Sequence, residues 1–302
     1  MADQLTEWHR QGMTTTVPVR GVPRAVFHRV SGSGSPVVFL HGFPASSFEW
    51  AGVAALAAGR HTVVTFDFLG YGASEKPRGH QYSVFEQADL TEALIGSLGF
   101  DAVTLVAYDY GAIVATELLA REPPFRIERC VFLNAGLYAD QYRPRLIQRA
   151  SLWPVAGRLL ARALNERQFL RSWSRVFSPG HPLDPDLARL HYRALRAGHP
   201  DPDLTARLLR YIPERAAHRA RFEPVFTDSP VPLSFLWGMR DPVSGARVAR
   251  ELRSRKPDAD FVEYPDLGHC PHIEAPERVA ADILARTTRP PPAGAENLCR
   301  PE

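Results

Sequence analysis

The chain has 302 residues, of which 45% are apolar, and carries 36 Lys and Arg against 33 Asp and Glu, a formal charge of +3. That size is enough to bury one large core plus a substantial insertion. No apolar stretch approaches the roughly 20 residues of a membrane span, and residues 1–10 lack the basic start and apolar run of a signal peptide, so we expect a cytoplasmic protein without a membrane span. Three scattered cysteines, Cys130, Cys270 and Cys299, argue against a disulfide framework and against a zinc site.

Charge is distributed unevenly along the chain. Residues 138–222 hold 16 Arg but only 7 Asp plus Glu. Such a segment is able to attract an anionic substrate or a membrane surface. The whole chain has only two lysines, Lys76 and Lys256, so a general preference for arginine and a solvated basic surface explain the segment as well. No aromatic-rich nucleic-acid motif accompanies the arginines, and no nucleic-acid partner is expected.

The first half of the chain alternates predicted strands with predicted helices. Two β-branched runs, 14–19 and 25–30, predict an opening hairpin around the turn 20–23. Apolar runs typical of buried parallel strands follow at 36–40, 61–66, 103–108 and 129–133. Helices are predicted from about residue 46, over 84–98 and over 111–121. Ser83 and Glu86 fit a capping box at the second of these helices.

The alternation fails between residues 137 and 227. Helix-like segments at 146–163 and 204–211 stand there between Pro and Gly breaks. The alternation then resumes with strands at 232–237 and 260–264 and helices at 244–255 and 276–286. This order predicts an α/β protein with a doubly wound, mostly parallel sheet and an inserted helical cap. The expected division is a core of 1–136 and 228–286, a cap of 137–227 and a disordered tail of 287–302.

Four polar turns follow predicted strands. They hold His41, Asp109, Asp241 and His269. In open α/β sheets the working site forms beyond the carboxyl ends of the strands, so these side chains are expected to meet. The run 106–111, Val-Ala-Tyr-Asp-Tyr-Gly, looks like a strand-to-helix nucleophile elbow with aspartate in place of serine. A carboxylate there attacks saturated carbon and forms an alkyl ester, although an aspartate after a strand also suits a helix cap.

These motifs resemble the epoxide hydrolase and haloalkane dehalogenase branch of the α/β-hydrolases, over residues 8–286. Within that branch, residues 66–72, 82–87 and 108–111 are most similar to hydrolases of the mesoderm-specific transcript protein type. The resemblance implies the α/β-hydrolase fold, a catalytic triad, and neither a metal nor an organic cofactor. The implied substrates are a small, largely apolar organic molecule and water.

The resemblance also implies a role for each member of the triad. Asp109 attacks an electrophilic sp3 carbon, and the N-terminal end of the following helix favours its ionised form. His269 then deprotonates the water that hydrolyses the resulting ester. Asp241 holds His269 in the required tautomer.

Two backbone N–H groups, those of Phe43 and Tyr110, are implied as oxyanion donors in the hydrolytic step. His41 is expected to organise the first of these turns and not to act as a base. Haloalkane dehalogenases usually carry tryptophan after the nucleophile, where this chain has Tyr110. Their second donor is usually an asparagine or a tryptophan, whereas Phe43 follows the His-Gly pair here. The absence of both usual halide donors favours an epoxide as substrate.

The cap is expected to supply the donor to the leaving atom. Tyr211 resembles one tyrosine of the epoxide hydrolase pair, but Trp153 stands where the other is expected. Three further tyrosines are potential substitutes: Tyr138, Tyr142 and Tyr192. Trp153 and Trp173 are alternatively able to offer indole N–H groups to a halide. The sequence therefore predicts an epoxide hydrolase-like enzyme. A haloalkane dehalogenase, another hydrolase of this fold and a non-catalytic ligand-binding member are the alternatives, and the oligomeric state stays open.

Overall fold

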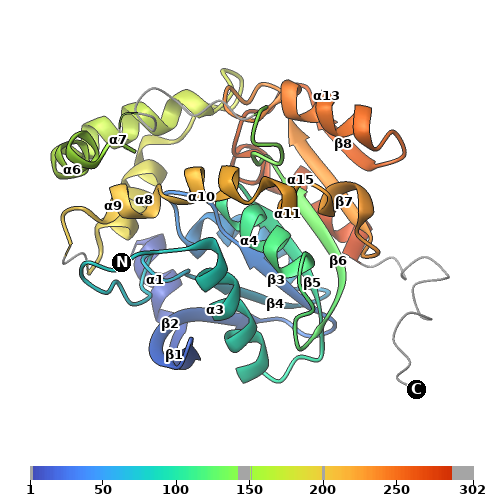
Figure 1. The fold of residues 1–302 in the computed structure, drawn as a ribbon, viewed down its shortest axis with the longest axis horizontal. Helices are drawn as coiled ribbons and strands as arrows, with labels where there is room; N and C mark the ends of the chain where they lie inside the picture. Colours follow the sequence, from blue (N-terminus) through green and yellow to red (C-terminus); the bar gives the residue numbers. More distant parts are fainter. Residues whose placement is uncertain (1–2, 142–149, 151, 199–200, 288–302) are drawn as a thin grey trace.

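An eight-stranded sheet forms the centre of the computed structural model, which describes residues 3–141, 150, 152–198 and 201–287 (Figure 1). The strand order is β1-β2-β4-β3-β5-β6-β7-β8. The strands are β1 (Met13–Val19), β2 (Val22–Ser31), β3 (Pro36–Leu40), β4 (Thr62–Phe66), β5 (Ala102–Tyr108), β6 (Arg126–Leu133), β7 (Leu233–Gly238) and β8 (Asp260–Tyr264). All eight strands expected from the sequence are present, with ends shifted by at most three residues.

The sheet is mostly parallel and covered on both faces. Only the β1–β2 and β2–β4 pairs are antiparallel. Residues 37–40 of β3 and 103–108 of β5 are all buried. Because successive strand residues point to opposite faces, burial of every residue means that both faces of the central strands are covered. The fold is the doubly wound α/β arrangement expected from the sequence.

The opening hairpin turns more tightly than the sequence predicted. Arg20 and Gly21 form the whole connection, with φ angles of 51° and 76°. Two consecutive positive φ angles are the geometry of a two-residue hairpin turn, so β2 begins at Val22, within the segment predicted as loop.

Helices precede, connect and follow the strands of the sheet. They are α1 (Gln4–Arg10), the 3-10 helix η1 (Ser47–Trp50), α2 (Ala51–Ala57), α3 (Val84–Ser97), α4 (Tyr110–Leu119), α13 (Ala246–Arg255), α14 (Pro271–Glu274) and α15 (Pro276–Thr287). Only one of the two side chains of the capping box predicted at α3 caps the helix. The Ser83 hydroxyl accepts the Phe85 N–H at 3.1 Å, but the Glu86 carboxylate pairs with His80 instead of the cap.

In the described residues between β6 and β7, the regular elements are helices, and we call these the inserted helices. They are α6 (Pro154–Ala163), α7 (Glu166–Trp173), η2 (Ser174–Val176), α8 (Pro185–Arg196), α9 (Leu204–Leu208), α10 (Tyr211–Ala217), α11 (Arg219–Phe222) and α12 (Val225–Asp228). In Figure 1, α6 and α7 lie at the upper left, and α9, α8, α10 and α11 run across the middle of the view. The helix predicted over 204–211 is wrong in extent: α10 starts at Tyr211, because Pro213 lacks an N–H and suits the first turn of a helix.

Parts of three expectations lie outside the described residues. These parts are residues 146–149 and 151 of the predicted helix 146–163, Cys299, and residues 288–302 of the predicted tail. Cys130 and Cys270 are buried free thiols. Within the described ranges, no helix combines the length and apolar character needed to cross a bilayer.

Candidate active site

Asp109 occupies a sharp turn between β5 and α4. Its φ and ψ angles are 45° and −108°. For a residue with a Cβ this conformation costs of order 1–3 kcal/mol, and such strain clusters at functional sites. Gly111 permits the turn, since a Cβ there would lie 2.4 Å from the carbonyl oxygen of Leu40. The Asp109 side chain makes no capping hydrogen bond to α4, so it does not fill the helix-cap role that its position also suited.

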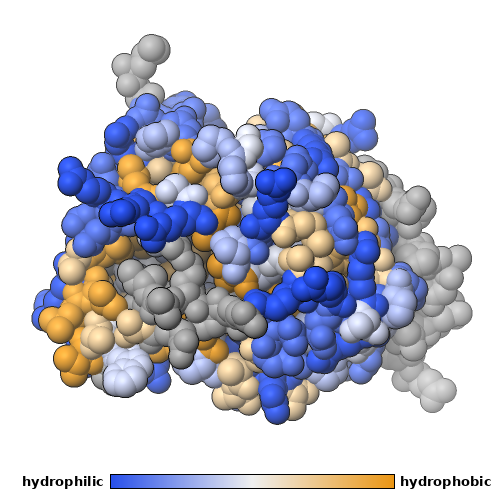
Figure 2. Space-filling view, turned by 90° about the horizontal axis from the view of Figure 1, so that it is seen from above, coloured by the Kyte–Doolittle hydropathy of each residue, from blue (hydrophilic) through white to orange (hydrophobic). Residues whose placement is uncertain are grey.

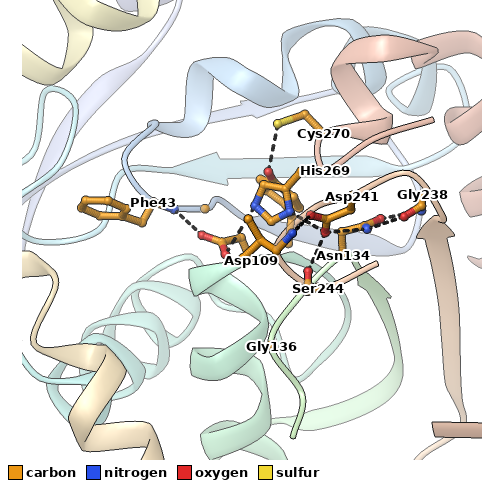
Figure 3. Close-up of polar contacts among 12 residues, drawn as sticks. Phe43, Asp109, Asn134, Gly136, Gly238, Asp241, Ser244, His269 and Cys270 are labelled. Carbon is orange, nitrogen blue, oxygen red and sulfur yellow. Dashed lines mark hydrogen bonds and ion pairs between the residues drawn. The ribbon is translucent and has the colours of Figure 1, made fainter. Parts of the chain in front are cut away.

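His269 lies between two carboxylates (Figure 3). Its Nδ1 is 2.8 Å from Oδ2 of Asp241, and its Nε2 is 3.7 Å from Oδ1 of Asp109. An ionised carboxylate only accepts hydrogen bonds, so Nδ1 carries a proton and donates it to Asp241. Nε2 is therefore the ring nitrogen that is able to exchange a proton on the Asp109 side.

Asp241 is held by three further donors. Its Oδ1 accepts the Val243 N–H at 2.6 Å, and its Oδ2 accepts the Ser244 hydroxyl at 2.6 Å and the Asn134 amide at 2.9 Å. Asn134 also bonds the backbone N–H and carbonyl of Gly238, at 2.6 and 2.9 Å (Figure 3). The sequence reasoning missed Asn134, although it directly follows β6 at the sheet edge where the other site residues lie.

The turn that follows β3 is anchored on both sides of Gly42. His41 Nδ1 donates to the Gly42 carbonyl at 2.9 Å, while its Nε2 accepts the Phe68 N–H at 3.1 Å. These partners require a neutral imidazole, and burial accordingly lowers the His41 pKa. On the other side, the Gly42 N–H donates to Oε1 of Glu49 at 2.6 Å. His41 thus sits where an organiser of this turn is expected, and the sequence reasoning overlooked Glu49.

The turn directs one backbone donor at Asp109. The Phe43 N–H donates to Oδ2 of Asp109 at 3.0 Å. Only glycine fits at position 42, since a Cβ would lie 2.7 Å from the Tyr108 ring and 2.9 Å from the Asp109 Cβ. The close packing of this turn therefore fixes where the Phe43 N–H points.

Burial and neighbouring charges shift the pKa values of the three titratable groups. Burial raises the Asp109 pKa, against the opposing effects of His269 and of the Phe43 and Tyr110 N–H groups. Burial alone lowers the His269 pKa, but the charge and hydrogen bond of Asp241, with the charge of Asp109, outweigh it and raise the value to about 9. Burial likewise raises the Asp241 pKa, and His269 reverses this to a net lowering. The resting site therefore favours a protonated His269 between two carboxylates.

A largely apolar cavity of about 140 Å³ opens above Asp109 and His269. Its walls come from the inserted helices and from the turn after β3. Its large apolar side chains include Phe43, Leu160, Leu164, Phe169, Leu195 and Leu209. The remaining polar side chains in its lining are Ser172, Trp173 and Thr205. A cavity of this size and polarity suits a compact organic molecule.

The candidate donors lie at different distances from this cavity. Tyr211 is buried, with its ring centroid 4.9 Å from that of Tyr110 and 6.2 Å from that of Phe43, but it does not line the cavity. Trp173 lines it. Trp153 does not, because it precedes α6 on the outer side and is 72% exposed. The structure thus does not bring Trp153 to the site.

The other tyrosines and the side chain after Asp109 also point elsewhere. Tyr138 is buried against Phe226, and Tyr192 packs on Phe169. Tyr142 lies outside the described residues. The Tyr110 ring stacks on Tyr71 and hydrogen-bonds Gln87. Among the described residues, no group of three or more His, Cys, Asp or Glu side chains is arranged to hold a metal ion.

Comparisons of the chain with known proteins find relatives in sequence. The sequence pattern of the alpha/beta hydrolase family matches residues 37–282. The putative hydrolase LipZ of Mycobacterium tuberculosis is 39% identical over 279 residues, covering 88% of this chain and 94% of LipZ. The mesoderm-specific transcript protein of Mus musculus is 35% identical over 259 residues, covering 82% and 77%.

Solved structures share the fold at lower identity. Haloalkane dehalogenase DbeA from Bradyrhizobium elkani has a TM-score of 0.76 at 23% identity, covering 91% of this chain and 96% of its own. Epoxide hydrolase CorEH has a TM-score of 0.73 at 19% identity, covering 91% and 98%. The family match over most of the chain, the relatives above 30% identity and the mostly parallel eight-stranded sheet together establish that this chain belongs to the α/β-hydrolase family.

Proposed function

We propose that this hydrolase cleaves small, largely apolar electrophiles through an ester formed between the substrate and Asp109. One observation carries the proposal: His269 contacts the carboxylates of both Asp109 and Asp241. Its Nε2 is 3.7 Å from the Asp109 carboxylate, in the turn after β5, and its Nδ1 bonds Asp241. A carboxylate at this point is suited to displacement at saturated carbon. A complete acid–base pair behind it is unnecessary for a protein that only binds a ligand.

In the first step, an oxygen of the Asp109 carboxylate attacks an sp3 carbon of the substrate. A carbon–oxygen bond forms as the bond to the leaving atom breaks. An epoxide oxygen leaves as an alkoxide and takes up a proton, whereas a halogen leaves as a halide ion. The product of this step is an alkyl ester of Asp109, and the enzyme carries one negative charge fewer at the elbow.

The loss of that charge prepares the second step. Asp109 is one of the groups that raise the His269 pKa to about 9. Once Asp109 is an ester, this effect disappears, so the pKa of His269 falls, the imidazolium releases its proton to solvent, and the neutral imidazole is then able to accept a proton. It then deprotonates a water molecule that attacks the ester carbonyl. The Phe43 and Tyr110 N–H groups stabilise the oxyanion before the alcohol product leaves.

An epoxide is the favoured substrate class because hydroxyl groups lie in the cavity wall or in a ring packed beside it. Tyr211 contacts the rings of Phe43 and Tyr110, while Ser172 and Thr205 line the cavity. A hydroxyl is able to give the leaving alkoxide a proton, as an epoxide requires. A haloalkane is the second candidate, because the indole of Trp173 also lines the cavity and is a suitable donor to a halide.

The cavity limits the size of the substrate. Its volume of about 140 Å³ is close to the roughly 150 Å³ of an engineered apolar protein cavity that accepts benzene. Substrates with about six to eight heavy atoms are therefore expected to fit without rearrangement of the inserted helices.

Enzyme and substrate meet in the cytoplasm under this proposal.

Isotope labelling of Asp109 tests the proposal. The purified enzyme is incubated with a panel of small epoxides and haloalkanes in water enriched in ¹⁸O, at enzyme in excess of substrate, and the peptide that contains Asp109 is analysed by mass spectrometry. Attack of water on the ester carbonyl puts one ¹⁸O atom into the Asp109 carboxylate. Turnover that leaves Asp109 unlabelled and places ¹⁸O directly in the product would exclude the ester.

A further inference from the structure

Helix α6 carries apolar residues on two opposite sides. Gly157, Leu160 and Ala161 face inward and line the cavity. At about 100° per residue, Val155 and Leu159 lie on the other side of the helix. A helix that is apolar on both sides normally lies between two apolar environments. One of these is the cavity, and the structure leaves the other side open.

The outer side of α6 is unusually exposed. Val155 is 74% exposed and Leu159 is 62% exposed, and Trp153 just before the helix is 72% exposed. In the described residues, only Met13, at 64%, exposes a large apolar side chain to a comparable degree. Figure 2, which shows the molecule from above, has a hydrophobic area at its left end. Exposed apolar side chains gathered in this way mark a contact surface.

The charged side chains of α6 border this apolar side and turn toward α9. Arg158 and Arg162 both approach Asp203, with N–O distances of 3.7 and 3.0 Å. They therefore point toward the N-terminal end of α9. Their positive charge is partly compensated there, and they border the apolar strip of Val155 and Leu159.

Arginines line the next helix. Arg167 and Arg171 on α7, and Arg175 in η2, follow at intervals of four residues and are all exposed. Residues spaced by four lie on one side of a helix. None of the three forms an ion pair within the part of the chain that the structure describes. The outer side of α6 thus carries an apolar strip. The elements that follow it, α7 and η2, carry a row of arginines without an ion pair among the described residues.

We propose that the outer side of α6 and the arginine row of α7 and η2 together bind the surface of an anionic lipid membrane. Trp153, Val155 and Leu159 enter the boundary between headgroups and acyl chains, where an indole with its polar N–H is well placed. The arginines pair with lipid phosphates and carboxylates. Binding brings the wall of the apolar cavity to the bilayer, in which apolar substrates dissolve.

Charge distinguishes this partner from a second copy of the chain. Two copies that met through this surface would enclose two arginine rows in one contact, and like charges within one contact repel. An anionic bilayer supplies both an apolar layer for the strip and negative charge for the arginines.

Vesicle sedimentation with the full chain tests the proposal. The probes are vesicles of phosphatidylcholine mixed with phosphatidylserine and vesicles of phosphatidylcholine alone. The wild type is expected to sediment with the mixed vesicles and to dissociate as salt increases. The triple variant Trp153→Ser, Val155→Ser, Leu159→Ser is expected to bind about 10-fold to 100-fold more weakly. The variant Arg167→Gln, Arg171→Gln, Arg175→Gln should lose about 10-fold or more and most of its salt dependence.

The matched control removes exposed apolar side chains elsewhere. Met13 on β1 and Leu56 on α2, 64% and 44% exposed, are replaced by serine, and binding should stay as in the wild type. Absence of binding to the mixed vesicles, or equal binding by the triple serine variant and the wild type, overturns the proposal. So does a wild type that fails to bind vesicles but forms a dimer in light scattering that the triple serine variant cannot form. Far-UV circular dichroism verifies that each variant is folded.

Discussion

The backbone N–H of Phe43 donates to Oδ2 of Asp109 at 3.0 Å, so an expected oxyanion donor already contacts the proposed nucleophile before any substrate is bound. The donor is fixed by its surroundings, because Glu49 and His41 anchor the peptide units on either side of Gly42. No reorganisation of the turn is then needed when charge develops at the Asp109 ester carbonyl.

Replacement of Asp241 by Asn should disable the second step more than the first. The amide loses the negative charge that helps raise the His269 pKa to about 9, and it no longer favours the proton on Nδ1. We expect the His269 pKa, followed by NMR of the imidazole, to fall by at least one unit. Ester hydrolysis should slow about 10³-fold to 10⁴-fold. An unchanged His269 pKa would mean that Asp241 is not its charge partner in solution.

The raised His269 pKa predicts a pH dependence of stability. The folded state holds this proton more tightly than the unfolded state, whose pKa is near 6.5. The stabilisation is therefore complete below pH 6.5 and is lost as the pH rises through about 9. The free energy of unfolding of the wild type minus that of His269→Gln should fall by about 3 kcal/mol between pH 6 and pH 10. Urea titrations measure this difference.

Exposed His218, exchanged for Gln, serves as the matched control for that experiment. If the difference in free energy of unfolding between the wild type and His269→Gln stays constant from pH 6 to pH 10, His269 does not bind its proton more tightly in the folded state.

Glu49 gives a second, opposite prediction. Burial raises its pKa to about 7, and its Oε2 lacks a hydrogen bond among the described residues, with His272 Nε2 3.8 Å away. The contribution of Glu49 to the free energy of unfolding is highest below pH 4.5 and is lost as the pH rises through about 7. Glu49→Gln keeps an acceptor for the Gly42 N–H and cannot ionise. Relative to the wild type, it should gain about 2–3 kcal/mol in unfolding free energy between pH 4.5 and pH 8.

Exposed Glu277, replaced by Gln, is the control for Glu49. If Glu49→Gln gains no stability between pH 4.5 and pH 8, the carboxylate is better solvated or better paired than its surroundings indicate.

Two substitutions separate the leaving-group donors. Tyr211→Phe removes a hydroxyl beside the oxyanion turn, and should slow ester formation from epoxides about 10²-fold or more if that hydroxyl protonates the alkoxide. Trp173→Phe removes the indole N–H from the cavity and should affect haloalkanes alone. Tyr192→Phe, which alters a tyrosine that does not line the cavity, is the control. Full epoxide activity in Tyr211→Phe would transfer the donor role to Ser172 or Thr205.

Much of the site could be predicted because it depends on local sequence. Asp109, Asp241 and His269 each follow an apolar strand within a few residues, and a parallel sheet gathers such positions at one edge. Glu49 escaped notice because it reaches Gly42 through the 3-10 turn η1, which has no periodic pattern in the sequence. The hairpin turn Arg20–Gly21 was predicted too long because Pro23 suggested a loop.

The inserted helices were harder to predict. They are short and separated by Pro and Gly, so the direction of each side chain is set by packing between helices and not by sequence spacing. Trp153 was expected near the substrate but is exposed before α6, whereas Trp173 on α7 lines the cavity. The packing of α6 and α7 decides which of the two tryptophans faces the cavity. The sequence pattern of the two helices is compatible with either one.

Trapping the ester is the most direct measurement of the central claim. His269→Gln is incubated with a substrate of the wild type, and the mass of the intact protein and of the Asp109 peptide is measured. The account predicts a covalent adduct on Asp109 that accumulates because no base activates water, and Asp109→Ala in the same background should form none. Rapid consumption of substrate by His269→Gln without any adduct, or an adduct on another residue, would contradict it.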